Sequence, residues 1–581
     1  MEMRYSSYRV EIKNIKFVSE NGLQYPRTAI ISFHDHKNEE ISTELLGYLE
    51  TRDIYTAIDE GKEIILDNCF IEDFSLSIYR QKKNINRKEY VRLKKFSARN
   101  TFFTAHTATD FSYADFGDSD ISFEGSHFAH GKVLFNNIRS GKGNFILSST
   151  YIKDGHIEFT GAEFSEGNFE FKNSVINDGL KDFQDMVFSK GDISFANTEF
   201  NSGEILFINS RFGEGNFSFK ISRIISGRID FHYTSFGEGD VIFERVEFGD
   251  SRVDFRAVDF GNGRVNFNRA VFGNGDFVME GALFKGTKFF FKRVYMGAGI
   301  KDFSLMEMKS AEASFEKTDF GSGELSFNGS SFRNLSLKSC HLDHYVDIRI
   351  SGADIIDLSD SIVRDIVDME PLNMEYHLNV LDLSGMKLLG KLYMDWNNNM
   401  CRQVIMNQEN TSLRQKSEQF RILKENFNVT GKYEDEDKAY VMFKRLESKS
   451  ELQETLKRKK GIAALPAYIS YGFRWLVFDA AGQYATNPIR VLFTMIVSYL
   501  VFSLVYLFMM LFSRSDIIAS VDDKLSVVAR AFYHSAITFL TIGYGDHYPS
   551  GSIRWMSGIE GFIGLFLMSY FTVAFVRKIL R

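Results

Sequence analysis

One stretch decides how most of this chain folds: ILFINSRFGEGNFSFK, residues 205–220. Three of its four phenylalanines, Phe207, Phe212 and Phe219, are separated by a step of 5 and then a step of 7 residues, and the longer step contains Gly213-Glu214-Gly215. The same two steps recur on both sides of the stretch and together make a repeat of 12 residues. Self-similarity at a fixed period is typical of solenoids and other repeat folds, so the region is interpreted as one architecture.

The repeat contains two series of phenylalanines. In the first series Phe occupies positions 188, 200, 212, 236, 248, 260, 272, 284, 320 and 332, with Ile224, Met296 and Met308 in intervening slots. In the second it occupies positions 159, 171, 183, 195, 207, 219, 231, 243, 255, 267, 291, 303, 315 and 327, with Met279 in the series. A small residue such as Ser210 stands two positions before a first-series Phe, and an aliphatic or aromatic one such as Ile205 stands before a second-series Phe. Pairs spaced by two residues lie on one face of a short strand.

The five-residue step, with a small residue two positions before an inward Phe, resembles that of the pentapeptide-repeat proteins. This resemblance implies a right-handed quadrilateral β-helix, here built of 12-residue half coils, over residues 101–395. One coil of four sides would then contain two of these half coils. Every second corner departs from the family's even step by two residues, with Gly expected to make a bulge or a positive-φ turn. The alternative is a β-sandwich, but a sandwich does not keep one step through so many repeats.

Three further segments lie outside the predicted solenoid. Residues 1–100 alternate apolar and polar side chains and predict a β-rich cap. Residues 396–460 predict a helical linker, with helices over 413–429 and 439–456 and a break at Gly431 and the acidic residues 434–437; it would cap the solenoid or, alternatively, make an oligomer contact. Residues 461–487 predict an interfacial helix. The alternative for this last segment is a helix that crosses the membrane, in addition to the two spans described below. Such a helix would place the solenoid outside the cell.

Composition excludes several functions. The net charge of -7 over 581 residues argues against nucleic acid as a partner. Cys69, Cys340 and Cys401 are too far apart in sequence for a disulfide framework or a zinc motif. Histidines and carboxylates in the repeats lack clustered catalytic spacing, so we predict neither an enzyme nor an organic cofactor. The start of the chain carries no charged segment followed by an apolar core, and no cleavable signal is expected.

A second motif lies near the other end: Thr541-Ile542-Gly543-Tyr544-Gly545-Asp546. Its backbone carbonyls and the Thr541 hydroxyl could replace the water around a bare cation if four copies faced one axis. Gly543 and Gly545 would take backbone angles that a Cβ disfavours. The motif resembles the filter signature of two-transmembrane potassium channels. The resemblance implies K⁺ bound at Thr541, Ile542, Gly543 and Tyr544, within a homotetramer.

The flanks of this motif predict a complete pore domain over residues 488–581. The apolar stretches 489–512 and 555–576 would be about 36 and 33 Å long as helices, enough to cross a bilayer. Residues 525–540 predict a pore helix that ends at the filter, with its partial negative charge toward the cation. We expect the protein in the plasma or inner membrane. Basic residues flank the two spans on one side, and the positive-inside rule therefore predicts that both termini lie in the cytoplasm. These residues are Lys457, Arg458, Lys459, Lys460, Arg474, Arg577, Lys578 and Arg581.

Residues near the filter are candidates for control of conduction. Asp546 would gather cations at the outer mouth. The loop that contains Asp516, Asp522 and Asp523 is expected on the same, external side. His547 beside Asp546 could confer acid sensitivity, although a plain solvated histidine is the favoured interpretation. Glu560, inside the second span, is interpreted as a brace behind the filter rather than as a local partner of Arg554. The glycines Gly558, Gly561 and Gly564 could provide a gating bend or close helix packing, and we weigh these equally.

The sequence thus predicts a potassium channel with a large cytoplasmic solenoid that regulates gating or assembly. The expected partners are other copies of the chain, the lipid bilayer, and a cytosolic ligand or protein on the solenoid. No span carries an arginine ladder, so strong voltage sensing is not expected. The rival interpretation is a membrane-tethered interaction scaffold whose pore conducts poorly or not at all.

Overall fold

The computed structural model describes residues 5–286, 288–371, 376–459, 461–520 and 524–580. These residues form two compact units, Met1–Asn407 and Gln408–Arg581, which we describe separately. Lys460, Asp522, Asp523 and Arg581, which entered the predictions of topology and external charge, lie outside the described residues.

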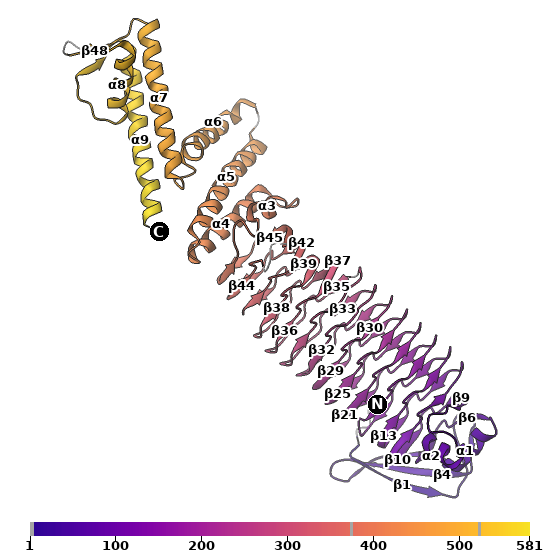
Figure 1. Ribbon diagram of the computed structural model, residues 1–581. Helices are drawn as coiled ribbons and strands as arrows, with labels where there is room; N and C mark the ends of the chain where they lie inside the picture. The colour runs from indigo at the N-terminus through magenta and orange to yellow at the C-terminus, as the bar shows by residue number, and fades with distance from the viewer. Residues whose placement is uncertain (1–4, 287, 372–375, 460, 521–523, 581) are drawn as a thin grey trace. The chain divides into compact units, whose positions relative to one another are not determined.

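The first unit is a β-solenoid (Figure 1). Short parallel strands stack from coil to coil. One such ladder of 14 strands runs from β6 (Glu63–Ile65) to β45 (His377–Asp382). Another contains β8 (Val91–Arg92), β11 (Ala114–Asp115), β14 (Arg139–Ser140), β18 (Glu163–Phe164), β22 (Val187–Phe188), β26 (Arg211–Phe212) and β30 (Ser235–Phe236). The predicted solenoid is confirmed, whereas the hand and the number of sides of its coil stay predictions.

The register gives the length of each coil. Phe164 pairs with Phe188, and Phe188 with Phe212, so consecutive coils are offset by two half coils, as expected. The amide of Met186 likewise donates to the hydroxyl of Ser210, 24 residues further along the chain. Beyond Phe332 the coil changes. Pairing of Ser331 with Gly352 marks a shorter coil, and pairing of Gly352 with His377 marks one slightly longer than the regular coil. The regular step therefore ends where aliphatic residues replace phenylalanine in the sequence.

The core of the solenoid consists of stacked phenylalanine rings. Phe207, Phe231 and Phe255 are fully buried or nearly so and lie in successive coils, with ring centroids 4.7 and 4.8 Å apart and ring planes within 10° of parallel. Each large aromatic side chain buries some ~150–250 Å². The coil spacing is close to the preferred distance between stacked rings, so the repeat of the sequence and the packing of the core have one cause.

Glycine at the long corners allows the backbone of the neighbouring coil to approach closely. A Cβ on Gly215 would lie 2.0 Å from the carbonyl oxygen of Gly191, so the coils approach too closely there for any side chain. Gly227 has in addition a φ of +126°. The expectation of positive φ at these glycines therefore holds at only some corners. Close approach of the coils is the wider cause.

The tight corners use left-handed residues, many of which are not glycine. Asn197, Asn209 and Ile221 follow one another at 12-residue intervals with φ of 54°, 58° and 62°. Asn tolerates this region well, because its short amide can bond locally, whereas a β-branched residue such as Ile221 is strained there. These left-handed corner positions were not predicted from the sequence.

Two lysines occupy inward-facing positions beside phenylalanines of the second series. Lys181 and Lys301 stand two residues before Phe183 and Phe303, where most repeats have an aliphatic or aromatic side chain. The Nζ of Lys181 donates to the carbonyl oxygens of Gly179 and Ser202 at 3.1 and 2.9 Å. Burial lowers the pKa of each lysine to about 8. These ammonium groups satisfy corner carbonyls that the core would otherwise leave without donors.

The N-terminal segment extends the ladder. Strands β1 (Ser7–Lys13), β4 (Arg27–His34) and β5 (Glu40–Tyr48) form an antiparallel sheet, and β5 then pairs in parallel with β7 (Cys69–Glu72). Helices α1 (Thr51–Asp59) and α2 (Leu76–Lys82) interrupt this part. The parallel ladder thus begins before residue 101. At the other end of the unit, the side chain of Asn407, next to α3 (Cys401–Met406), donates to the carbonyl oxygen of Asn379 in β45.

The second unit is helical. Its helices are α4 (Leu413–Val429), α5 (Tyr433–Arg458), α6 (Leu465–Arg474), the π-helical segment η2 (Trp475–Ala480), α7 (Pro488–Phe512), α8 (Val527–Phe539) and α9 (Ile553–Ile579). Helix α4 has the predicted bounds and begins with a capping box between Ser412 and Gln415. Helix α5 starts six residues earlier than expected. The acidic residues 434–436 form its first turn, because negative charge stabilises a helix N-terminus, and do not form the predicted break.

Replacing a stacked ring should destabilise the solenoid. For Phe231→Ala we expect a loss of about 3–5 kcal/mol in unfolding free energy, because the change leaves a cavity between two rings. Tyr295→Ala, which removes a ring that is 54% exposed, is the matched control. Denaturant unfolding of the full-length protein in detergent, followed by circular dichroism, measures both. Equal midpoints for the two variants would contradict the stacking account.

Candidate ion-conducting site

The candidate filter begins at the C-terminus of α8. The Ser526 hydroxyl accepts a hydrogen bond from the backbone of Ala529 and caps the start of the helix. At the other end the chain turns back on the last carbonyls: the amide of Thr541 donates to Thr538 O at 3.0 Å, and the amide of Ile542 donates to Ile537 O at 2.8 Å. The loop therefore lies against the negative end of the helix dipole, which favours a cation.

The backbone of the loop is unusual at three positions. Gly543 and Gly545 have φ of +61° and +77°, as expected from the sequence, with open space where a Cβ would stand. Thr541 also has a positive φ, of 55°. A left-handed conformation is strained for a β-branched residue, and such strain is often found at functional sites. Ile542 and Tyr544 are 47% and 71% exposed in the isolated chain.

Asp546 is anchored at the end of the loop. The hydroxyl of Tyr533, on α8, donates to its carboxylate at 2.7 Å, and the amide of Ser520 donates to its carbonyl oxygen at 2.8 Å. The hydrogen bond from Tyr533 is the main cause that holds the pKa of Asp546 below its usual value. The side chain therefore carries a negative charge beside the candidate filter.

His547 is not a solvated histidine. It begins strand β49 (His547–Pro549), which pairs with β48 (Ile517–Ala519), and its ring lies 5.1 Å from the ring of Tyr533. The residue is only 7% exposed. The favoured interpretation of this residue was wrong, because His547 belongs to a two-stranded antiparallel sheet that the sequence did not predict.

Glu560 connects all three helices of the pore domain. The residue lies on α9 and is fully buried. Its carboxylate accepts a hydrogen bond from the hydroxyl of Tyr506 on α7 at 2.6 Å and another from the hydroxyl of Ser535 on α8. Arg554, the alternative partner, donates instead to the carbonyl oxygen of Pro549. The contacts are compatible with the predicted brace behind the candidate filter, and the role itself stays a prediction.

The three glycines of α9 have different surroundings. A Cβ on Gly564 would lie 2.1 Å from the carbonyl oxygen of Phe539, the last residue of α8. At Gly561 the nearest atom, Thr538 O, is 4.0 Å away, and at Gly558 there is none within 4 Å. Gly564 therefore serves close packing of α9 on α8. The geometry assigns no such role to Gly558.

The partners of Glu560 and Asp546 were missed in the sequence. Tyr506, Tyr533 and Ser535 are polar groups within apolar helices, and that is the signal that could have found them, because buried hydroxyls in such helices require partners. Among the described residues, no cluster of three or more His, Cys, Asp or Glu side chains is placed to hold a metal ion.

Two findings identify the class of this domain. Within the described residues, α7 and α9 are the two helices that are long and apolar enough to cross a membrane. Residues 494–581 match a family model described as "Ion channel". The C-terminal part of the chain is therefore an ion-channel domain of the two-transmembrane type, and it follows a β-solenoid in the sequence. No curated protein matches the chain.

Enlarging Gly564 should separate α9 from α8. For Gly564→Ala we expect a loss of about 1–3 kcal/mol in stability, because the methyl group meets a backbone oxygen that cannot rotate away. Gly558→Ala adds the same methyl group in open space and is the control. Thermal unfolding of the purified protein in detergent compares them. A Gly564→Ala protein as stable as the control would contradict the close packing.

Removing one acceptor oxygen from Glu560 should weaken the brace. In Glu560→Gln the amide oxygen can accept from Tyr506 or Ser535, but the amide nitrogen cannot. We expect the loss of one buried hydrogen bond to cost about 1–3 kcal/mol, with the cost reduced if Ser535 relies on its longer contact of 3.3 Å with the carbonyl oxygen of Tyr499. Thr572→Ala removes a hydroxyl that bonds within α9 and serves as the control. The same thermal unfolding experiment applies. The brace is refuted if both variants unfold at the temperature of the unaltered protein.

Proposed function

We propose that this protein is a potassium-selective channel in which four copies of the chain surround one pore. The observation that carries the proposal is the loop 541–545, which lies at the C-terminus of α8 with left-handed glycines, inside a domain that matches an ion-channel family. Backbone carbonyls of Thr541, Ile542, Gly543 and Tyr544 coordinate dehydrated K⁺, and Gly545 completes the turn toward Asp546. Potassium is the transported ion.

The isolated chain supports assembly around a shared axis. One chain supplies one wall of such a filter, so selection of K⁺ requires several copies in a closed ring. The loop is exposed at Ile542 and Tyr544. Of the residues in the most apolar part of each helix, only 11% are buried in α7 and 22% in α9. Neighbouring copies and lipid cover these surfaces in a homotetramer.

Charge and apolar exposure support the topology. The last turn of α9 contains Arg577 and Lys578, and Lys457 and Arg458 end α5, so the positive-inside rule places both termini in the cytoplasm of a plasma or inner membrane. Helix α6 exposes Ile469 and Phe473 by 64% and 59%. An interfacial helix buries such side chains at the membrane surface.

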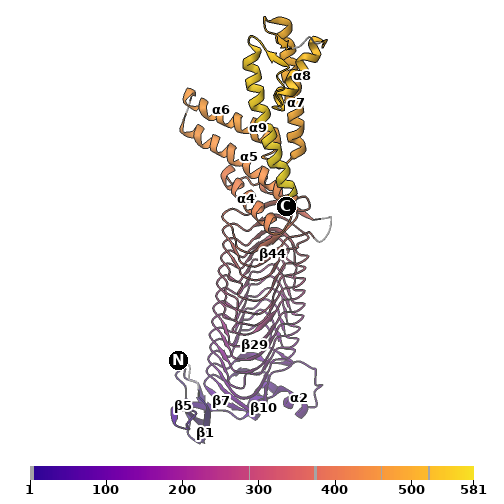
Figure 2. The ribbon, with the colours of Figure 1, turned by 90° about the vertical axis from the view of Figure 1, so that its left-hand side faces the viewer.

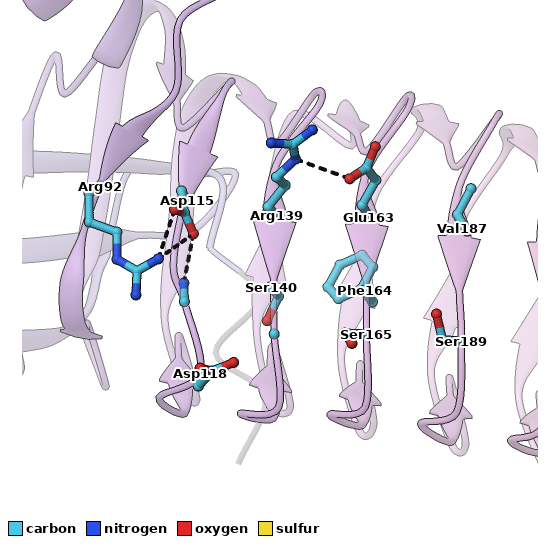
Figure 3. A pocket seen from close by; sticks show the side chains of 12 residues that line it. Arg92, Asp115, Asp118, Arg139, Ser140, Glu163, Phe164, Ser165, Val187 and Ser189 are labelled. Atoms are coloured by element: carbon cyan, nitrogen blue, oxygen red, sulfur yellow. Dashed lines mark hydrogen bonds and ion pairs between the residues drawn. The ribbon is translucent and has the colours of Figure 1, made fainter.

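The solenoid is the regulatory or assembly domain in this proposal. Its outer face mixes both signs of charge. Arg92 bonds to Asp115 and Arg139 to Glu163 beside an open cavity of about 400 Å³ (Figure 3). These pairs favour a polar partner of mixed charge over nucleic acid.

Reconstituted protein tests the proposal. Purified protein in liposomes should carry K⁺ in preference to Na⁺, with block by barium. Gly543→Ala should abolish selective flux, because a Cβ disfavours the φ of +61° at this position. Gly472→Ala, in α6 and with open space around it, is the control and should conduct. Absence of K⁺ flux from the correctly assembled protein would support a membrane-tethered scaffold instead.

A further inference from the structure

The C-terminal end of α9 contacts the start of α5 through a compact group of charges. The guanidinium of Arg577 lies 2.9 Å from the carboxylate of Asp437 and 3.5 Å from that of Glu436. Lys578 lies 3.1 Å from the second oxygen of Asp437. The guanidinium also lies over the ring of Tyr440, 4.8 Å from its centroid. We call Arg577, Lys578, Glu436, Asp437 and Tyr440 the α5–α9 junction.

The carboxylates of the junction and Arg577 are largely buried, which distinguishes their contact from surface ion pairs, whereas Lys578 is 40% exposed. Glu436 and Asp437 are 2% and 7% exposed, and the side chain of Arg577 is 20% exposed. Exposed ion pairs contribute little because water screens them, whereas breaking a buried pair leaves an uncompensated charge. Compare Arg421, whose pairs with Glu418 and Glu425 within α4 leave it 45% exposed.

The helix dipoles strengthen the junction. The carboxylates belong to the first turns of α5, whose N-terminus is partially positive, and the cations to the last turn of α9, whose C-terminus is partially negative. Each set is favoured on its own helix as well as across the contact. The cation–π contact with Tyr440 fixes the direction from which Arg577 approaches.

Helix α5 holds two further segments that lead into the first span. Arg445 donates two hydrogen bonds of 2.8 Å to the carboxylate of Asp479 in η2, a residue that is 6% exposed. Glu451 pairs with Arg474 at the end of α6. The chain then reaches α7 at Pro488, where Arg490 donates to the carbonyl oxygen of Ala480. One helix, α5, therefore makes ion pairs both with the segment that leads to α7 and with the end of α9. Figure 2 shows the course of α5, α6, α7 and α9.

We propose that α5 couples the cytoplasmic part of the chain to the pore, with Arg577 and Lys578 as positioning residues for the inner end of α9. This inference rests on the proposed function. If α5 moves while α9 stays in place, buried charges are separated, which is unfavourable. A movement of α5 therefore shifts the equilibrium between the open and closed pore. The α4–α5 hairpin is then where a cytosolic signal reaches the ion path.

A double-mutant cycle tests the coupling. Arg577→Gln and Asp437→Asn should each change the initial rate of K⁺ flux in liposomes by at least about fivefold and in the same direction. The double variant should differ from the wild type by no more than either single variant, because both changes remove the same interaction. Arg421→Gln, the exposed control, should leave the rate unchanged. Unchanged rates in both single variants of a conducting protein, or additive effects, would overturn the coupling.

A second measurement does not depend on conduction. Hydrogen exchange of the full-length protein should show faster exchange in the first turns of α5 in Arg577→Gln than in Arg421→Gln, because the buried carboxylates lose their counter-charge. If the unaltered protein carries no K⁺ but this difference is present, the proposed function fails and the junction stands. Equal exchange in the two variants would refute the junction itself.

Discussion

Both units of this protein are built on the need of every buried backbone amide and carbonyl group for a hydrogen-bond partner. In the solenoid the partner is the next coil, as in the ladder from Phe164 to Phe188 and Phe212. In α7 and α9 the partner is the next turn of the same helix, which is the arrangement that a bilayer permits. The loop 541–545 belongs to neither pattern. Two left-handed glycines and a left-handed threonine set the direction of its chain, and the proposed binding of K⁺ depends on this backbone geometry.

The sequence predicted the architecture correctly in the regions where a single physical cause determines the fold. The regular phenylalanine step predicted the length of the coil, because a ring stacks only on a ring in register. The change to a shorter and then a longer coil after Phe332 was not predicted, since aliphatic side chains such as Ile356 fill space without imposing one spacing. The start of α5 was misplaced for a similar reason. An acidic run was interpreted as a break, although the same charges stabilise a helix N-terminus.

The candidate site was predictable in its backbone and not in its side-chain contacts. The glycine spacing around Tyr544 indicated the positive φ angles, because only backbone sterics are involved. The contacts of Glu560 with Tyr506 and Ser535 join residues 54 and 25 positions apart and depend on how three helices pack. The burial of His547 depends on the pairing of two three-residue strands that are separated in the chain by α8 and the loop 541–545. Long-range packing of this kind leaves no periodic signal in a single sequence. The role of Gly564 likewise became visible only when Phe539 was seen beside it.

The regular part of the solenoid has a consequence for how such a chain can change over time. Successive coils present equivalent rings, glycines and corner asparagines. If the gene segment for one coil is deleted or duplicated, the coils that become neighbours therefore make the same contacts as before. The body of the solenoid then becomes shorter or longer by one strand spacing, about 4.8 Å, without a new fold. The reach of this domain is thus an inherited length that evolution can adjust in equal increments, while the ion-channel domain keeps its sequence.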